Sequence, residues 1–301
     1  MLKCRGAGLS QENLPYIPGR VVVGTIESLG SEVKLPFQVG DRVVGLVESG
    51  GNSRFLSTDA ENLVKASPTI KNSDAACLVE DYMTAYRALR VARNSFKGAA
   101  LFGMNIFITD GYSPVGQAVI QLANLEGANI YCCAKKSHHS YLKSISRRVN
   151  CFSTQREVWL PLVLEKMDIV IDNTCADGYN SSWQALNETG ILVCLPAINM
   201  GYSETLCGLL DVDNMLRQFS QTKAKYAMSQ TVFLDLHQDF DKNREEFARD
   251  LMYLMYLREQ GKIKPKVAEK VALDDVGDAQ KLIANYKNNG TVVCMPWKKC
   301  G

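Results

Sequence analysis

The sequence predicts an α/β chain in which a doubly wound parallel sheet is joined to a smaller region of short strands. Between about residues 105 and 200, apolar strands alternate with helical segments. This rhythm is typical of a parallel sheet with helices on both faces. Between about residues 16 and 66, β-branched runs are separated by Gly, Pro and Asp turn residues, which favours a small barrel or sandwich.

Length and composition exclude several classes of protein. The 301 residues are enough for about two domains with sizeable cores. With 46% hydrophobic and 22% charged residues, the chain is neither disordered, collagen-like nor a disulfide-stabilised miniprotein. A net charge of +2 predicts no bulk attraction to nucleic acid or to an anionic membrane. No apolar run is long enough to span a membrane and the first ten residues are too polar for a signal peptide, so a cytoplasmic location is expected.

The spacing of apolar and turn residues predicts the individual elements. In the first region, strands are expected at 21–26, 42–47 and 54–57. Helical periodicity then appears over 74–79 and 83–89, with Ser73 or Asp74 as the N-cap. In the sheet region, strands are expected at 105–109, 128–133, 168–172 and 191–195, and helices over 115–123 and around Trp183 and Leu186.

The C-terminal region predicts two helices and a strand. An amphipathic helix is expected over 241–260, and its apolar spacing favours core packing over a groove for a partner. The residues at that spacing are Phe247, Leu251, Leu254, Met255 and Arg258. Asp274 and Asp275 are expected to cap a helix that runs through Tyr286 and ends at Gly290, before a last strand at 291–295.

The ten cysteines are scattered, and no two of them form a Cys-x-x-Cys pair. Most lie singly in apolar stretches, as Cys77, Cys175, Cys194 and Cys294 do, which predicts buried, reduced thiols.

The segment from Ile108 to Gly116 lies where a dinucleotide site is expected, after an apolar strand and before a helix. The N-terminus of such a helix offers unpaired N–H groups and partial positive charge to a pyrophosphate. Glycines allow the backbone to approach the phosphates, but only Gly111 and Gly116 are present. Ser113 and Pro114 stand where a full glycine-rich turn has no side chains, and a proline also lacks an N–H donor.

The residues after the second strand of this region indicate which dinucleotide is favoured. An NAD site usually has an acidic residue there, which binds the ribose 2′-hydroxyl. Here residues 134–139 read Ala-Lys-Lys-Ser-His-His and contain no acid. Cations suit a 2′-phosphate, so NADPH is favoured over NADH, although a solvated basic start of a helix would explain the same residues. No metal site is expected, because adjacent histidines do not easily share one ion.

Together these segments resemble the medium-chain dehydrogenase/reductase superfamily over nearly the whole chain. The matching motifs are 14–19 with 24–30, Val39-Gly-Asp-Arg-Val43, Asp74-Ala-Ala-Cys77, 82–86, 115–123, 261–265 and 290–293. Arg20 stands where zinc-dependent members carry a histidine ligand, and the four-cysteine lobe is missing. The chain therefore resembles the zinc-independent, zeta-crystallin-like quinone oxidoreductase branch. Residues 8–13 and 109–116 further resemble the subgroup named quinone oxidoreductase-like protein 1.

The resemblance implies a Rossmann dinucleotide-binding domain at 89–265. It also implies a GroES-like β-barrel domain, shortened at its N-terminus, at 1–88 and 266–301, so that the C-terminal segment completes the barrel. The implied reaction is hydride transfer from NADPH to a quinone or enone, with no zinc. The implied cofactor-binding residues are Thr84 near the nicotinamide, Gly111, Ser113, Val115 and Gly116 at the pyrophosphate, Lys135, Lys136 and His138 at the 2′-phosphate, and Asn173 facing the cofactor. No catalytic residue is predicted. Tyr16 is the one aromatic residue with an acidic proton that is expected near the opening of the substrate site.

Several residues depart from the family pattern. Besides Ser113 and Pro114, Pro196 replaces a glycine and Thr291 replaces a lysine, and the loop at 11–14 is very short. The chain also begins inside what should be the second or third strand of the barrel, so either the barrel is pared down or the sequence begins late.

These departures leave an alternative function open. The chain could be a catalytically degenerate dehydrogenase-fold subunit of a multiprotein complex, of the early-endosomal, messenger-RNA-transport type found in the resembling subgroup. In that case it would lie at the periphery of early endosomes. An intact cofactor turn favours the enzyme and a filled turn favours the subunit. By the same resemblance, a homodimer paired through the cofactor domain is expected.

Overall fold

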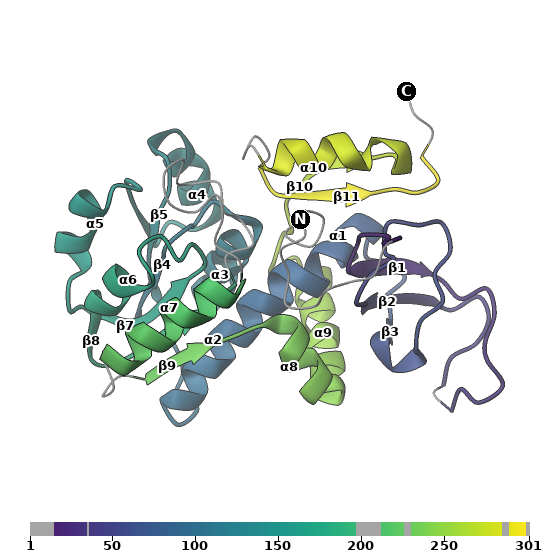
Figure 1. Ribbon diagram of the computed structural model, residues 1–301, viewed down its shortest axis with the longest axis horizontal. Helices are drawn as coiled ribbons and strands as arrows, with labels where there is room; N and C mark the ends of the chain where they lie inside the picture. The colour runs from purple at the N-terminus through teal and green to yellow at the C-terminus, as the bar shows by residue number, and fades with distance from the viewer. Residues whose placement is uncertain (1–14, 35, 197–211, 226–229, 285–288, 299–301) are drawn as a thin grey trace. The chain divides into compact units, whose positions relative to one another are not determined.

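The computed structural model describes residues 15–34, 36–196, 212–225, 230–284 and 289–298 (Figure 1). These residues divide into two compact units, one of them Thr84–Asp235 and the other residues 15–83 with 236–298. The boundaries expected from the sequence lay after residues 88 and 265. The helices between residues 236 and 259 belong to the unit that contains the short strands.

The first unit contains a six-stranded sheet in which all strands run parallel, as predicted. The spatial order is β6-β5-β4-β7-β8-β9. The strands are β4 (Asn105–Ile108), β5 (Asn129–Cys133), β6 (Val149–Phe152), β7 (Met167–Asp172), β8 (Leu186–Cys194) and β9 (Gln230–Phe233). The chain winds outward from β4 to β6, returns to β7 beside β4, and then winds outward to β9. This is the doubly wound Rossmann order.

Helices flank this sheet. They are α2 (Met83–Ser95), α3 (Pro114–Leu125), α4 (His139–Ile145), α5 (Arg156–Val163), α6 (Asn180–Gln184) and α7 (Val212–Lys225). On one face, Phe107 of β4 packs in a buried cluster with Trp159 of α5, their ring centroids 4.8 Å apart. Because side chains alternate along a strand, Ile106 and Ile108 point to the other face, where α3 packs against β4 and β5. Leu186, expected in a helix, instead begins β8.

The second unit contains two small sheets. Strands β1 (Val21–Thr25), β2 (Arg42–Leu46) and β3 (Leu63–Lys65) are antiparallel, and β10 (Val267–Val271) pairs in parallel with β11 (Thr291–Cys294). The expected GroES-like domain with a C-terminal contribution is confirmed. The expected strand at 54–57 is wrong, because Ser53 Oγ bonds the carbonyl oxygens of Gly50 and Phe55 in a turn, each at 2.7 Å. The third strand comes later, at β3.

Helices of the second unit are α1 (Asn72–Cys77), a π-helical turn (Leu78–Tyr82), α8 (Leu236–Lys242), α9 (Arg244–Glu259) and α10 (Val276–Ala284). The predicted N-cap at Ser73 or Asp74 is wrong, because Lys71 precedes α1 and both side chains are buried within the helix. The predicted helix over 241–260 is broken at Asn243, whose backbone leaves the helical region. Phe247 and Leu251 of α9 are buried, as expected for a core-facing helix.

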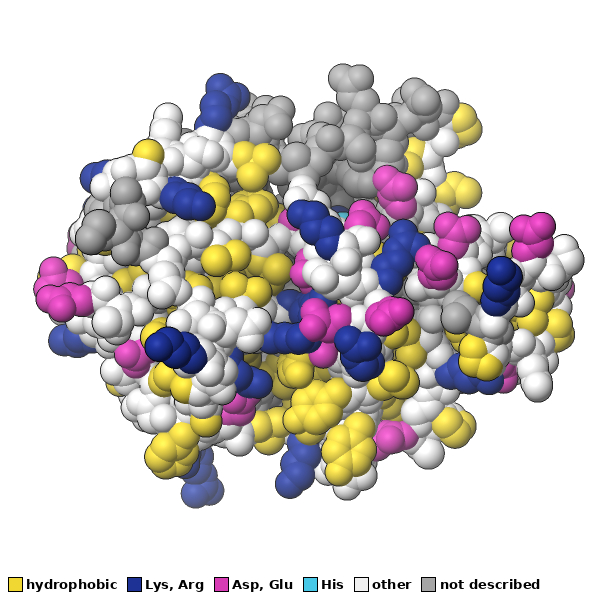
Figure 2. Space-filling view, turned by 90° about the horizontal axis from the view of Figure 1, so that it is seen from below, with side chains coloured by type: hydrophobic (Ala, Val, Ile, Leu, Met, Phe, Trp, Pro, Cys, Tyr) yellow, Lys and Arg dark blue, Asp and Glu magenta, His cyan; other side chains and the backbone are white. Residues whose placement is uncertain are grey.

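Within the described ranges, three further short turns are of 3-10 type, at Ala60–Asn62, Lys136–His138 and Leu273–Asp275. Among the described cysteines, Cys77, Cys132, Cys133, Cys175 and Cys194 are buried, Cys151 and Cys294 are half-buried, and all are free thiols. On the face shown in Figure 2, basic and acidic side chains are interspersed, in agreement with the small net charge. Within the described ranges, no helix has the length and apolar character needed to cross a membrane. The motif at 8–13, the loop at 11–14 and Tyr286 of the expected C-terminal helix lie outside the described residues.

Candidate functional site

The turn between β4 and α3 lies at the carboxyl end of the central strand of the parallel sheet. On either side of β4, the strand order reverses, because β5 lies to one side and β7 to the other. In open parallel sheets, ligands bind at the carboxyl ends of the strands where the order reverses. The turn therefore lies in the position that a dinucleotide site requires, as the sequence predicts.

Side chains of the turn accept hydrogen bonds from the turn's own backbone N–H groups. Asp110 Oδ1 accepts the N–H of Tyr112 at 3.0 Å and that of Ser113 at 3.2 Å. Ser113 is the N-cap of α3, and its Oγ accepts the N–H of Gly116 at 3.0 Å. Pro114, at the first position of α3, has no N–H. The donors that would face a pyrophosphate are thus largely paired within the chain.

Asp110 is a buried carboxyl group, with 4% of its surface exposed. Burial raises its pKa to about 6, although the two backbone N–H bonds lower it. Near neutral pH the group is mostly ionised. A negative charge is therefore held directly beneath the turn where phosphates would lie.

Asn173, the residue after β7, joins that strand to the turn. Its Oδ1 accepts the backbone N–H of Asp110 at 3.0 Å, and its Nδ2 donates to Ser113 Oγ at 2.9 Å. Thr109 completes the junction, because its Oγ1 accepts the Asn173 N–H at 3.1 Å and donates to Asp172 Oδ1 at 2.9 Å. Asn173 thus fixes the turn relative to β7, and its predicted role beside a cofactor is compatible with this position.

Both glycines are required by the packing of α3 against the sheet. A Cβ atom on Gly116 would lie 2.0 Å from the carbonyl oxygen of Asp110, and one on Gly111 would lie 2.6 Å from Cys132 Sγ. Neither position accepts a side chain without movement of the backbone or of β5. The glycines that remain therefore keep the close approach that a dinucleotide turn needs.

The end of β5 carries the predicted basic residues. Lys135 and Lys136 are exposed, whereas the His138 ring stacks on Tyr112 of the turn, with centroids 3.5 Å apart and planes 10° apart. Tyr141 contacts the same Tyr112 ring edge-on at 6.1 Å. Burial lowers the pKa of His138, and the charge of Lys135 lowers it further. His138 therefore stacks on the turn, and its role at a 2′-phosphate stays a prediction.

The remaining predicted residues lie in α3, in α2 and in the second unit. Val115 is in the first turn of α3, half-buried, and Thr84 is buried in the first turn of α2. Tyr16 is half-buried and belongs to the second unit. Thr291, which replaces the family's lysine, donates a hydrogen bond to the Asp81 carboxylate within the second unit. Asp81 is half-buried, and burial raises its pKa to about 7 against the lowering effect of the Thr291 bond.

Sequence reasoning missed two features of the site. Asp110 is one. The sequence does contain a recognised turn pattern here, in which an aspartate side chain accepts the backbone N–H groups of the residues two and three positions later. The stack of Tyr112 on His138 is the other, and it joins two loops that only the folded sheet brings together. Gln117 supports the stack, because its Nε2 donates to the Tyr112 carbonyl at 2.7 Å and its Oε1 accepts the Tyr141 hydroxyl at 2.8 Å.

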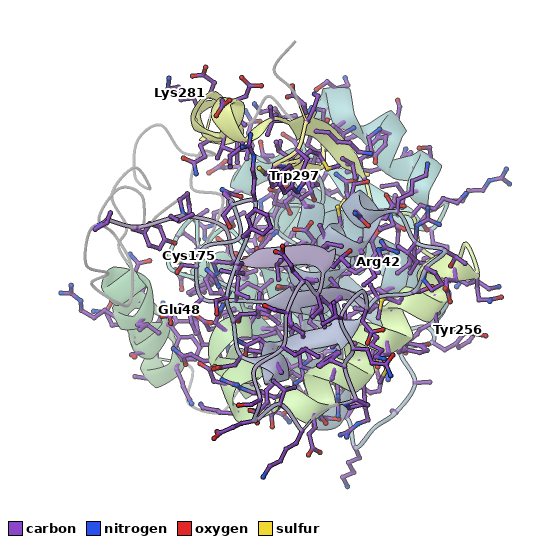
Figure 3. The ribbon with its side chains drawn as sticks, turned by 90° about the vertical axis from the view of Figure 1, so that its right-hand side faces the viewer. Arg42, Glu48, Cys175, Tyr256, Lys281 and Trp297 are labelled. Carbon is purple, nitrogen blue, oxygen red and sulfur yellow. The ribbon has the colours of Figure 1, made fainter. Side chains whose placement is uncertain are left out.

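The second unit contains an open cavity of about 1130 Å³. It is lined by β1, residues 51–58 and β11, with Glu80 and Asp81 among its polar groups. At its edge, Phe55 and the exposed Trp297, which is labelled in Figure 3, pack edge to face at 5.6 Å. The Arg54 guanidinium lies over the Trp297 ring at 5.4 Å. Within the residues that the structure describes, no group of three or more His, Cys, Asp or Glu side chains could hold a metal ion.

Comparisons with known proteins agree with the fold. No protein-family model matches the chain. The mouse protein named synaptic vesicle membrane protein VAT-1 homolog-like is 25% identical over 290 residues, which are 93% of this chain and 67% of the mouse protein. A quinone oxidoreductase-like protein 2 homolog from Nematostella vectensis is 25% identical over 303 residues, covering 97% of this chain and 77% of its own length.

Solved structures superpose on nearly the whole chain. The human VAT-1 homolog-like protein gives a TM-score of 0.75 at 22% identity, covering 99% of this chain and 85% of its own. CurK enoyl reductase gives 0.77 at 23% identity, with coverage of 97% and 83%. Mycobacterial Rv1454c, complexed with NADPH, gives 0.78 at 21% identity, with coverage of 95% and 84%.

The finer likeness to the protein 1 subgroup stays a prediction, because the quinone oxidoreductase-like relative found here is numbered 2. The chain has the fold of the medium-chain dehydrogenase/reductases, and its expected resemblance to their quinone oxidoreductase-like branch is confirmed.

Proposed function

We propose that this chain is an oxidoreductase that transfers hydride from NADPH to a quinone or an enone without zinc. One observation carries the proposal: the turn from β4 to α3 lies at the reversal of strand order, at the carboxyl end of the sheet, where open parallel sheets bind their ligands. The names of relatives and neighbours, which include quinone oxidoreductase-like and enoyl reductase proteins and one complex with NADPH, support the reaction class and the cofactor.

The residues present fit this dinucleotide in two respects and depart from it in one. The glycines permit close approach of the backbone, and the exposed Lys135 and Lys136 belong to a stretch, residues 134–139, whose sequence contains no acid to repel a 2′-phosphate. The departure is the turn itself, where Asp110 and Ser113 already bind the N–H groups. We expect NADPH to bind more weakly than in a bare glycine turn, and to bind better when Asp110 is protonated.

The roles of this chain's residues are to bind and to orient. When bound, NADPH supplies the hydride from its nicotinamide ring. The N-terminus of α3, with Val115 in its first turn, would hold the pyrophosphate, and Lys135 and Lys136 would hold the 2′-phosphate. Asn173 would keep the turn in place through its bonds to Asp110 and Ser113. Thr84 remains the predicted neighbour of the nicotinamide, and no side chain is assigned as a proton donor.

Calorimetric titration with NADPH and then with NADH tests the proposal. We expect NADPH to bind in the micromolar range and NADH more weakly. Gly116→Asp should abolish binding, because its side chain would meet the Asp110 carbonyl and repel the pyrophosphate. Gly277→Ala is the matched control, since a Cβ there meets nothing within 4 Å. Absence of NADPH binding up to millimolar concentration, at both pH 5.5 and pH 8, would overturn the proposal.

The pairing of the turn's N–H groups with Asp110 and Ser113 also favours a second function. A turn that satisfies its own donors does not need a dinucleotide to be stable, which suits a dehydrogenase-fold subunit without chemistry that acts through protein partners. Lys135→Glu separates the two functions. It should weaken NADPH binding if the chain is an enzyme, and should leave assembly with partners unchanged if the chain is a subunit.

A further inference from the structure

Two cysteines lie opposite each other beneath the candidate cofactor turn. Cys132 on β5 pairs directly with Cys151 on the neighbouring strand β6. Their sulfur atoms are 3.9 Å apart, and the Cys132 thiol donates to Cys151 Sγ. Neighbouring strands are spaced by about 4.8 Å, which lies within the Cα separation of roughly 4.4–6.8 Å that disulfides span. The backbone is therefore already placed for a cross-link, and the sulfurs alone have to approach.

The two thiols differ in a way that assigns their order of reaction. Cys151 is half-buried, and the hydrogen bond from Cys132 lowers its pKa, with a smaller contribution from the charge of Lys143. Cys132 is buried, and its pKa is raised by the same bond and by burial. The thiolate is the nucleophile in thiol oxidation. Cys151 is thus the thiol that meets an oxidant, and Cys132 is the thiol that resolves the product.

Cys132 is in direct contact with the turn. A Cβ on Gly111 would lie 2.6 Å from Cys132 Sγ and 2.7 Å from Cys132 Cβ, so the Cys132 side chain fills the space next to this glycine. The Gly111 N–H also donates to the carbonyl of Cys133 at 2.9 Å. A movement of Cys132 Sγ toward Cys151 removes the packing that supports Gly111 and, through it, Asp110.

We propose that Cys132 and Cys151 form a hydroperoxide-sensitive dithiol whose oxidation to a disulfide loosens the turn from β4 to α3. The Cys151 thiolate attacks a peroxide oxygen, the O–O bond breaks, and the leaving oxygen takes a proton to become water or an alcohol. This converts Cys151 to a sulfenic acid. Cys132 then attacks the Cys151 sulfur, the S–O bond breaks, and a second water leaves with the Cys132 proton. Two thiols are oxidised and one hydroperoxide is reduced, and an external dithiol reverses the change.

Mass spectrometry of the full chain tests the cross-link. After treatment with hydrogen peroxide, blocking of free thiols and digestion, we expect a linked peptide pair that contains Cys132 and Cys151. Cys151→Ser should abolish it, and Cys132→Ser should leave a sulfenic acid on Cys151 that dimedone traps. Cys294→Ser, which removes a half-buried thiol of the second unit, should leave the link intact, as should Cys133→Ser. A wild-type chain in which Cys151 is oxidised without a link to Cys132 would overturn the proposal.

Hydrogen exchange tests the effect on the turn without any cofactor. The amides of Tyr112, Ser113 and Gly116 should exchange faster after oxidation, and the change should be reversed by dithiothreitol and absent in Cys151→Ser. Unchanged exchange in a chain shown to carry the disulfide would refute the coupling. A further consequence, reversible loss of NADPH affinity on oxidation, rests on the proposed function. Failure of NADPH binding in both redox states would count against that function alone, because the cross-link and the exchange are measured independently.

Discussion

Asp110→Asn tests the role of the buried carboxylate under the turn. The rise in the pKa of Asp110 from 3.8 to about 6 means that the folded chain binds this proton more tightly than the unfolded chain does. Each pKa unit corresponds to about 1.4 kcal/mol, so the rise corresponds to about 3 kcal/mol. This contribution to the free energy of unfolding is fully present below about pH 4. It is lost as the pH rises from about 4 to about 6, because the folded state then has to hold the charge.

Asparagine has the same shape as aspartate and its Oδ1 can accept the same two N–H bonds from Tyr112 and Ser113. It carries no charge at any of these pH values. At pH 8 we expect Asp110→Asn to raise the free energy of unfolding by about 2–3 kcal/mol, less roughly 1 kcal/mol if the new amide N–H₂ finds no acceptor. At pH 5 the gain should be smaller, because the wild-type carboxyl is then mostly protonated.

Urea unfolding of both chains at pH 5 and at pH 8 measures this difference. Asp278→Asn, on the exposed surface of α10, is the control and should show no such pH dependence. Asp110→Asn should also bind NADPH more tightly than wild type at pH 8, by roughly tenfold or about 1.4 kcal/mol. Wild-type affinity should approach that of the variant as the pH falls through about 6. A variant that is no more stable than wild type at pH 8 would refute the assignment of Asp110 as a strained, ionised group.

Two further predictions concern the second unit. Arg258→Met should lower the free energy of unfolding, measured by denaturant titration, by about 2–3 kcal/mol. The reason is that Asp74, 8% exposed, loses a guanidinium whose Nη2 lies 2.7 Å from its Oδ2. The control Lys281→Ala breaks an exposed ion pair and should leave the unfolding midpoint unchanged. Thr291→Val removes the hydroxyl that donates to Asp81 and should raise the pKa of Asp81 above its value of about 7. The cost, about 1–3 kcal/mol, should be seen at pH 8 and should shrink at pH 6, where Asp81 is protonated in both chains; equal losses at the two pH values would contradict it.

The parts of the fold that could be predicted from the sequence are those whose side chains are buried on both faces. Residues 106–108 of β4 and the apolar side of α3 are nearly inaccessible, so their apolar pattern is dictated by local position alone. The segment at 54–57 has equally good strand residues, yet its backbone is not a strand. Arg54 Nε donates to the Pro296 carbonyl at 3.2 Å, and Phe55 packs on Trp297. Contacts with the far end of the chain decide this segment, and no local pattern contains them.

In the candidate site too, some residues could be predicted from local sequence and others depend on distant contacts. Gly111, Gly116 and Ser113 were predicted because a strand followed by a turn and a helix has a recognisable spacing. His138 was predicted as a phosphate ligand from its place after β5, but its stacking on Tyr112 depends on how two loops meet above the sheet. Spacing predicts which residues reach the end of a strand. Spacing does not predict which of these residues then packs against a neighbouring loop, as His138 does against Tyr112.

The glycines and the lysines carry different weight in deciding between an enzyme and a subunit. Gly116 is required by packing alone, since a Cβ there would lie 2.0 Å from the Asp110 carbonyl oxygen with or without a cofactor. A chain that had lost its chemistry would therefore still need this glycine in order to fold. Lys135 and Lys136 are exposed, and replacement of either should have little effect on folding. The affinity of Lys136→Glu for NADPH relative to NADH is thus the sharper measurement: a lowered preference with unchanged stability requires a 2′-phosphate at the end of β5, and an unchanged preference excludes it.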